Sequence, residues 1–234
     1  MLNYEEYKLL MNRQLKKKDV RERVFQDNVI RPFLQVLLTD YDIEPVDVKI
    51  NSSEHDYTQY CGTYVKNGIE ITATPDLCIS DNWNWENRKN IVNYKCVVEI
   101  KSPILDPITG FEPSKYRCLE EVKRHLNAKK NSKVILTDGI TWTFYERELN
   151  PIIASICLGN LDYRLKSNSN RKKTGLERSA GGRPIIDGIK WKCGEKQLVD
   201  NEVILELFGK LLEYEKEIKE FIELKEQLIR FVTE

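Results

Sequence analysis

Two short apolar segments that carry acidic residues constrain the fold of this chain more than any other feature. The first reads Ile-Thr-Ala-Thr-Pro-Asp-Leu-Cys-Ile over residues 71–79, and the second reads Cys-Val-Val-Glu-Ile-Lys-Ser over residues 96–102. Side chains alternate in direction along a β-strand, so Glu99 and Lys101 share one face while their apolar neighbours face the other way. We therefore expect two strands of one sheet, with Asp76 and Glu99 meeting at the sheet edge.

The order of the remaining elements indicates the fold class. Helices are expected over residues 3–18, about 20–38, about 113–130 and 201–234, and strands over 46–50, 69–79, 96–102, 133–137, 141–147 and 152–158. Pro32 should kink the second helix or begin a new one. Helices and strands in this order predict an α/β or α+β protein with a mixed central β-sheet flanked by helices.

Length and apolar spacing predict how the chain is divided. With 234 residues, 41% of them hydrophobic, the chain fits one domain with an elaboration. We expect a main domain over residues 1–165, a basic flexible loop over 166–190 and a C-terminal helical extension over 191–234. The apolar spacing of residues 201–234 predicts one amphipathic helix about 45 Å long. Part of this helix is expected to pack on the core, and part to pair with a second copy in a homodimer.

Charge and cysteine content limit the setting and the partners. The chain has 37 basic and 37 acidic residues, so its net charge neither favours nor excludes a nucleic-acid partner. Six cysteines without a short framework spacing and only two histidines argue against a structural zinc site. The apolar stretches are too short to cross a membrane, and the N-terminus lacks a signal-type apolar core. These features predict a cytoplasmic, reduced protein.

The residues at the expected sheet edge suit metal-dependent chemistry. Carboxylates such as Asp76 and Glu99 bind hard divalent cations, and a lysine beside them can position an attacking water. This is the chemistry of metal-dependent phosphodiester hydrolysis. The acid-x-Lys pattern alone is weak, because it occurs six times in the chain. Only the copy at residues 99–101 follows an apolar strand with a Pro-Asp element.

Glu22 has two interpretations. It lies three and seven residues before Phe25 and Val29, on the apolar face of the second predicted helix. A carboxylate on a buried face is costly unless a cation meets it. In one interpretation Glu22 lies in the first helical turn, where the helix dipole favours an acid. In the other it reaches a metal site, and the sequence leaves both open.

Two polar segments are candidate nucleic-acid contacts. The segment 166–184 is rich in basic residues, and the candidate contacts in it are Arg171, Lys172, Lys173, Arg178 and Arg183. These residues could lie along phosphates, or the segment could be only a solvated linker. Trp83 and Trp85 could stack on bases, or they could cover an edge of the sheet.

Taken together, these residues resemble the PD-(D/E)xK nuclease superfamily. They are most similar to the N-terminal nuclease domain of type I restriction enzyme motor subunits and its stand-alone relatives. Asp76 resembles the acid of the Pro-Asp element, and residues 99–101 resemble the (D/E)xK element. Residues 22–34 resemble the first helix of the family, where a glutamate precedes an Ile-x-Pro-x-Leu step. Residues 135–145 resemble its Leu-Thr-Asn/Asp-Gly-x-x-Trp strand pair, and the match covers about residues 20–148.

The resemblance implies a restriction-endonuclease-like core and a DNA endonuclease that requires Mg²⁺, with Mn²⁺ as a substitute, for restriction or phage defence. The implied metal ligands are Asp76, Glu99, the Ile100 carbonyl and Glu22. Lys101 would orient the attacking water or help to deprotonate it. One element departs from the family pattern. The helix after the lysine usually carries Gln-x-x-x-Tyr, whereas this chain reads Glu-Val-Lys-Arg-His over residues 121–125.

Other functions stay open at this point. The same fold could serve a catalytically inactive subunit that binds nucleic acid or regulates a partner. The chain could also be an interaction protein that works through residues 201–234. An RNA substrate is a further alternative, because no residue is identified that would read base edges or the 2′-hydroxyl.

Overall fold

The computed structural model of the protein describes residues 2–19, 21–46, 61–84, 93–128, 132–165, 184–198 and 213–234. Its helices are α1 (Tyr4–Lys16), α2 (Glu22–Phe25), the π-helical turn η1 (Gln26–Ile30), α3 (Arg31–Leu37), α5 (Glu112–Leu126) and α7 (Lys219–Thr233). Its strands are β1 (Asp42–Pro45), β2 (Thr63–Lys66), β3 (Ile69–Thr72), β4 (Leu77–Asp81), β5 (Asn93–Ile100), β6 (Lys133–Thr137), β7 (Thr141–Glu146), β8 (Ile156–Cys157), β9 (Gly159–Leu165), β10 (Pro184–Trp191), β11 (Lys196–Leu198) and β12 (Glu213–Glu215). Every helix in these ranges is too short or too polar to cross a lipid bilayer.

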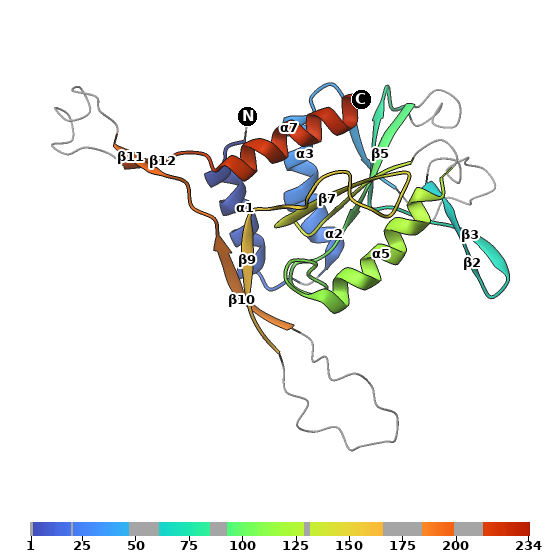
Figure 1. Cartoon of the computed structure of the whole chain (residues 1–234), viewed down its shortest axis with the longest axis horizontal. Coiled ribbons are helices and arrows are strands. Elements are labelled where there is room, and N and C mark those ends of the chain that lie inside the picture. The colour runs from blue at the N-terminus through green and yellow to red at the C-terminus, as the bar shows by residue number, and fades with distance from the viewer. Residues whose placement is uncertain are drawn as a thin grey trace, which may run out of the picture.

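A mixed six-stranded sheet in the order β1-β4-β5-β6-β7-β8 forms the centre of the protein (Figure 1). β5 and β6 run parallel, and α5 makes the crossover between them. Such a crossover is needed because parallel neighbours cannot be joined by a tight turn. The other neighbouring strands are antiparallel. The predicted mixed central sheet flanked by helices is therefore confirmed.

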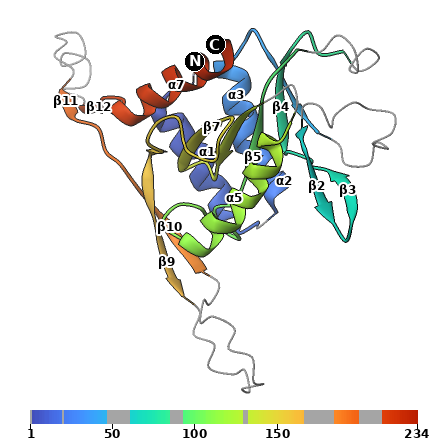
Figure 2. The same ribbon diagram turned by 45° about the vertical axis from the view of Figure 1, so that its right-hand side comes forward.

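Alternation along the strands divides the apolar residues between two clusters. Val98 and Ile100 belong to the larger cluster, to which α1, η1, α3 and α7 contribute apolar side chains. Val97 and Leu136 belong to the smaller cluster, which α5 closes. Figure 2 shows α5 on one side of the sheet and α1 and α3 on the other. The predicted alternation along β5 is thus confirmed, and Glu99 lies on the α5 side.

The second predicted helix is present, with a π-helical turn in its middle. α2, η1 and α3 follow one another without a break. Pro32 lies in the first turn of α3, where a missing N–H leaves no helical hydrogen bond unmade. As predicted, the proline marks the start of a new helical segment, and η1 widens the turn directly before it.

The single strand predicted over residues 69–79 is wrong, because this segment forms two strands in different sheets. β3 pairs with β2 in a separate hairpin, whereas β4 pairs with β1 and β5 in the central sheet. Pro75 lies between β3 and β4, and a residue without an N–H cannot occupy the middle of a central strand. Asp76 therefore directly precedes β4 instead of ending a strand.

Two further strand predictions need correction. β1 lies ahead of the strand predicted at 46–50, and residues 47–50 fall outside the described ranges. Only the two residues of β8 pair in the region predicted as a strand over 152–158. α5, β6 and β7 agree closely with their predictions.

The single helix predicted over residues 201–234 is wrong in the described part before Lys219. Residues 213–215 form β12, which pairs with β11, and residues 201–212 fall outside the described ranges. Local apolar spacing favours a helix, but pairing with β11 overrides it at this point. α7 itself packs with Phe221, Leu224 and Leu228 in the larger apolar cluster.

A buried aspartate fixes the loops at the carboxyl ends of β5 and β6. Oδ2 of Asp138 accepts the backbone N–H groups of Ile108 and Thr109 at 2.9 and 2.8 Å. Its Oδ1 accepts the Thr109 hydroxyl at 2.9 Å and the N–H groups of Ile140 and Thr141 at 3.0 and 2.9 Å. One carboxylate thus joins the turn after β6 to the loop before α5.

Replacing this carboxylate should destabilise the protein strongly. Asp138→Ala leaves several buried donors without an acceptor, so the free energy of unfolding should fall by about 3 kcal/mol or more. Urea denaturation followed by circular dichroism measures this change. Asp106→Ala is the matched control, because Asp106 lies in the same loop, is 33% exposed and forms its ion pair with the exposed Arg117. It should change stability by less than about 1 kcal/mol, and equal losses in the two variants would contradict the role of Asp138.

Candidate metal centre

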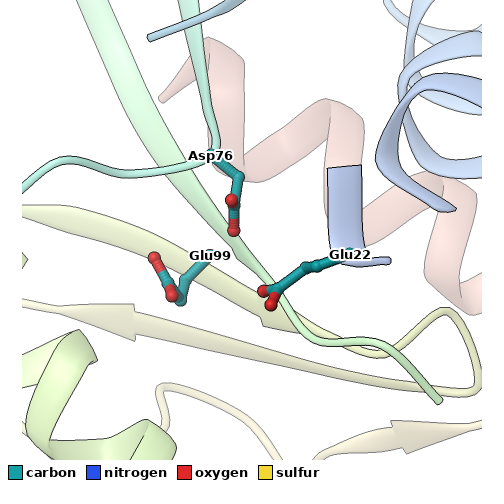
Figure 3. Close-up of side chains that lie close together, drawn as sticks. All are labelled: Glu22, Asp76 and Glu99. Carbon is teal, nitrogen blue, oxygen red and sulfur yellow. The ribbon is translucent and has the colours of Figure 1, made fainter. Parts of the chain in front are cut away.

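Three carboxylates from separate parts of the chain meet beside the carboxyl end of β5 (Figure 3). Glu22 is the first residue of α2, Asp76 directly precedes β4, and Glu99 is the residue before the end of β5. One carboxylate oxygen of each lies within 4.8 Å of the other two. We call these three residues the acid trio.

Hydrogen bonds to neighbouring backbone hold Asp76 in position. Its N–H donates to the Val98 carbonyl at 3.1 Å, and its Oδ2 accepts the Ile100 N–H at 2.7 Å. Its carbonyl accepts the Val46 N–H at 3.3 Å and the Gln26 side-chain amide at 3.4 Å. Oδ2 is thereby directed toward β5, while Oδ1 has no hydrogen-bond partner in the described part of the chain.

Lys101 places a positive charge among the carboxylates. Its Nζ lies 2.5 Å from an oxygen of Glu99, 3.0 Å from Glu22 and 3.0 Å from Glu121 on α5. The residue is only 8% exposed, and its backbone N–H donates to the Thr137 carbonyl at 2.8 Å. The ammonium group therefore lowers the repulsion among acids that would otherwise face one another.

His125 of α5 contacts Glu99 from the other side. Its Nδ1 lies 2.8 Å from the Cys61 carbonyl, and its Nε2 lies 3.2 Å from Glu99 Oε2. Because a carbonyl oxygen can only accept, Nδ1 carries a hydrogen and donates it. The imidazole therefore joins the Cys61 carbonyl, through Nδ1, to the Glu99 carboxylate, through Nε2.

A close backbone approach brings the Cys61 carbonyl to His125. Gly62 has a φ of +82°, and a β-carbon on it would lie 2.0 Å from the Arg124 carbonyl oxygen. Only glycine fits at this distance and in this backbone conformation. The segment that leads into β2 therefore packs directly on the end of α5, which fixes the imidazole through its Nδ1.

Burial and mutual repulsion make the acid trio electrostatically strained. Burial raises the pKa of Asp76 well above its ordinary value, and the charges of Glu99 and Glu22 raise it further. Burial also raises the pKa of Glu22, although Lys101 opposes the shift. At Glu99 burial acts to raise the pKa, but the hydrogen bond to His125 and the charge of Lys101 lower it overall.

Lys101 shows the reverse balance. Burial acts to lower its pKa, but the charges of Glu99, Glu22 and the other nearby acids raise it above the ordinary lysine value. The group is therefore an ammonium ion at neutral pH. One lysine and one imidazole cannot offset the charges of the trio and Glu121 together, so bound protons or a further cation must supply the difference.

The donor set fits a hard divalent cation. All three members of the acid trio offer carboxylate oxygens, which are the ligands that Mg²⁺ and Mn²⁺ prefer. A bound cation would favour the ionised forms of Asp76 and Glu22, whose protons burial and repulsion otherwise retain. Lys101 and His125 are positioned to orient Glu99 without occupying the unpartnered oxygen of Asp76.

The structure brings four of the predicted site residues together. Glu22, Asp76, Glu99 and Lys101 meet at one place. The interpretation of Glu22 as an acid in the first helical turn is confirmed, and its role in a metal site stays a prediction. Ile100 contributes its N–H to Asp76, and the role of its carbonyl as a ligand stays a prediction.

The predicted nucleic-acid contacts are only partly covered by the described ranges. The basic residues Arg171, Lys172, Lys173, Arg178 and Arg183, and also Trp85, lie outside them. Trp83 packs against Tyr94 with ring centroids 6.3 Å apart, and the backbone N–H of Trp83 donates to the Asp42 carboxylate at 2.6 Å. These contacts favour the interpretation of Trp83 as a cover for the edge of the sheet.

Sequence reasoning missed two residues of the site. Glu121 and His125 lie four residues apart, on one face of α5, and contact Lys101 and Glu99 respectively. They occupy the place where the chain departs from the Gln-x-x-x-Tyr pattern of the family that it resembles. The departure is the available signal, because it puts two ionisable groups at helical spacing on the helix that follows the lysine.

Comparison of the chain with profiles of known families, with characterised proteins and with solved structures finds no match. The interpretation of the site therefore rests on its own geometry. The protein is a mixed α/β protein with a cluster of three carboxylates suited to a divalent cation. A lysine and a histidine contact this cluster.

Divalent cations are expected to stabilise the protein through the acid trio. Saturating Mg²⁺ or Mn²⁺ should raise the Tm of the wild type, since a ligand that binds only the folded state stabilises it by about 2.7 kcal/mol at 100 times its Kd. In EDTA, Asp76→Asn should not lower the Tm, because it removes one acid from a repulsive group and its amide oxygen can still accept the Ile100 N–H. With metal, its Tm should rise far less than that of the wild type. Differential scanning fluorimetry measures both effects.

Asp81→Asn is the matched control for this measurement. Asp81 lies at the far end of β4 and pairs with Lys95 at 2.9 Å. This variant should respond to metal as the wild type does. An equal metal-induced rise of Tm in Asp76→Asn and the wild type would place the ion away from the acid trio.

Proposed function

We propose that the protein is a metal-dependent nuclease that hydrolyses phosphodiester bonds of DNA, with Mg²⁺ as its metal ion and Mn²⁺ as a substitute. The observation that carries this proposal is the meeting of the acid trio with Lys101, two residues beyond Glu99. Carboxylates for a metal ion and a lysine for the attacking water are the groups that this hydrolysis requires. The same residues carry the resemblance to PD-(D/E)xK nucleases.

The strand arrangement supports a restriction-endonuclease-like core as part of the proposal. β4 and β5 are antiparallel neighbours, and Asp76 and Glu99 lie on them or directly beside them. α5 then crosses to β6, and a tight turn leads to β7. The four sequence elements that resemble the family therefore surround one site. A role in restriction or phage defence belongs to the same proposal.

Each residue of the site has a defined task in this reaction. Asp76, Glu99 and Glu22 would hold the ion, which when bound acts as a Lewis acid on the phosphate and lowers the pKa of a water. The Ile100 N–H keeps Asp76 turned toward β5. His125 holds the second oxygen of Glu99, so that the first stays directed at Lys101.

Lys101 acts in this scheme as a donor of hydrogen bonds. The surrounding acids keep its pKa high, so it carries its proton and cannot accept another. It would orient the attacking water and offset the negative charge that develops on the phosphate. Between the two roles that the resemblance implies, this environment favours orientation of the water over its deprotonation.

The hairpin of β9 and β10 supports contact between DNA and the basic segment at 166–183. The Tyr163 hydroxyl donates to the Gly110 carbonyl at 2.9 Å, and its ring packs against Phe111 with centroids 6.0 Å apart. These contacts tie the hairpin to the loop that runs from Lys101 to α5. The predicted basic residues lie between β9 and β10 in the sequence, outside the described ranges, and phosphate contacts by them are part of this proposal.

Cleavage of both DNA strands would use two such sites, and a homodimer through the C-terminal segment is the arrangement that we propose for it. Ile222 and Ile229 lie two turns apart on α7 and are each 41% exposed, whereas the opposite face of this helix is buried in the core. The following experiment separates this proposal from three alternatives: binding of nucleic acid without catalysis, action on RNA, and a purely protein-binding role.

Purified protein should cut supercoiled plasmid in Mg²⁺ or Mn²⁺ and leave it intact in EDTA. Asp76→Asn and Lys101→Gln should each lower the cleavage rate by about 100-fold or more, because loss of one preorganised charge in a dry site commonly costs this much. Gel electrophoresis of timed samples measures the rate. Circular dichroism of each variant establishes that it is folded.

Glu223→Gln is the matched control for these variants. Glu223 is the acid of another acid-x-Lys triplet, and it is exposed on α7. This variant should cut at the wild-type rate. Cutting of RNA alone would change the substrate class, and folded protein that cuts neither plasmid, single-stranded DNA nor RNA with either metal would contradict the nuclease proposal.

A further inference from the structure

The connection between α1 and α2 carries a concentration of positive charge directly before the acid trio. Residues 13–23 contain six basic and two acidic side chains, although the whole chain has no net charge. Of the two acids, Glu22 belongs to the trio. Asp19 forms an ion pair with Arg21, whose Nε and Nη2 lie 3.0 and 2.7 Å from the two carboxylate oxygens of Asp19. Arg23 pairs with Asp27 at 3.0 Å, so the excess positive charge lies mainly on the lysines that end α1.

Three consecutive lysines, Lys16, Lys17 and Lys18, end α1, and we call them the lysine turn. All three are exposed, and within the described ranges no acid pairs with any of them. Lys16 and Lys17 also border a hollow of about 730 Å³ along α1. Basic residues at the end of a helix stabilise it through the helix dipole, so their charge alone does not indicate a ligand.

The backbone of Lys18 supplies the second observation. Its φ is +53°, in the left-handed region, and its N–H donates to the Leu15 carbonyl at 3.0 Å. This is the position after a helix end that glycine occupies at the lowest conformational cost. A lysine here makes the fold less stable than a glycine would. The side chain of Lys18 is exposed, so its charge is accessible to a ligand in solvent.

We propose that the lysine turn binds phosphates of the same nucleic-acid strand whose scissile phosphate lies at the acid trio. This inference rests on the proposed nuclease function. Lys18 and Glu22 are four residues apart, so their Cα atoms are at most about 14 Å apart. Phosphates of one strand follow at a rise of about 3.4 Å per nucleotide, so the lysine turn reaches phosphates within about four nucleotides of the trio.

The two charged groups have complementary tasks in this arrangement. The acid trio offers carboxylate oxygens, which would attract a phosphate only through a bound cation, whereas the lysine turn attracts phosphates directly. Lysine contacts to phosphates fix the position of a strand without reading its sequence. The lysine turn would therefore set the register of the strand and leave the chemistry to the trio and Lys101.

Substitution of Lys18 by glycine separates this role from a role in stability. Binding of a short fluorescent DNA duplex is measured by anisotropy in EDTA, which prevents metal-dependent cleavage, over a range of salt concentrations. Lys18→Gly should bind several-fold more weakly, and the slope of log K against log salt should become less steep by about 0.9. Its Tm should rise by about 2–4 °C, because glycine adopts the left-handed backbone without strain. Adding Lys16→Gln and Lys17→Gln should lower the slope by a similar amount each.

Arg147→Gly is the matched control. Arg147 is exposed, has a φ of +61° and lies at the other end of β7 from the trio, where its N–H donates to the Ser132 carbonyl at 2.8 Å. This variant removes the same charge and relieves the same strain, so its Tm should rise while its DNA affinity and salt slope stay at the wild-type values.

The outcomes distinguish a failure of this inference from a failure of the nuclease proposal. Unchanged affinity and slope in Lys18→Gly, an equal loss in Arg147→Gly, or no binding by the wild type at low salt would overturn it. If the wild type cuts plasmid while Lys18→Gly binds normally, only the lysine turn is rejected. If the wild type binds through the lysine turn but cuts nothing, the lysine turn stands and the nuclease proposal fails.

Discussion

The contact of one buried ammonium group with several carboxylates is the interaction on which the rest of the site depends. Lys101 touches Glu99, Glu22 and Glu121, which come from β5, α2 and α5. Removing one partner of such a buried group is costly, because the remaining charges lose both solvent and counter-charge. The positions of three elements are therefore linked through a single side chain at the end of β5.

The surrounding structure holds this group in place mainly through backbone hydrogen bonds. The Thr137 carbonyl accepts the Lys101 N–H, and the Ile100 N–H holds Asp76. The Asp138 network then fixes the turn that follows Thr137 and the loop that leads from Lys101 to α5. The apolar clusters on the two faces of the sheet set the positions of the strands, whereas these polar contacts set the ends where the acids meet. The fold thus accommodates a repulsive acidic site that lowers its own stability, as strained functional sites commonly do.

The sequence predicts the core of the site well, because strand alternation is a local property. It places Glu99 and Lys101 together on one face of β5 and proposes Asp76 as their neighbour, and the structure has all three in one site. It could not predict the contact of His125 with the Cys61 carbonyl, because this contact joins residues 64 positions apart and depends on the close approach at Gly62. Such an approach leaves no periodic signal in a single sequence.

Competing local signals explain the incorrect elements. Apolar residues continue across residues 69–79 and predict one strand, but Pro75 divides the segment between two sheets. A proline has no N–H for a central strand, and this is a stronger indication of a strand end than hydrophobicity is of a continuous strand. The apolar spacing before Lys219 predicts a helix, but residues 213–215 form β12, which pairs with β11. The pairing partner determines the structure of this segment more strongly than its own apolar spacing. Proline chemistry was readable from the sequence, whereas strand pairing over this distance was not.

The most direct test of the central claim is diffraction from crystals grown with Mn²⁺, with data collected at the manganese absorption edge. The account predicts an anomalous peak between Asp76 and Glu99, at about 2.0–2.2 Å from their carboxylate oxygens, the range for small divalent cations with oxygen ligands. It also predicts that the ammonium group of Lys101 moves away from at least one of its present carboxylate partners. An ordered site without manganese at a saturating concentration, with Lys101 still joining Glu22, Glu99 and Glu121, would contradict it. The acids would then be a structural charge cluster and not a metal centre.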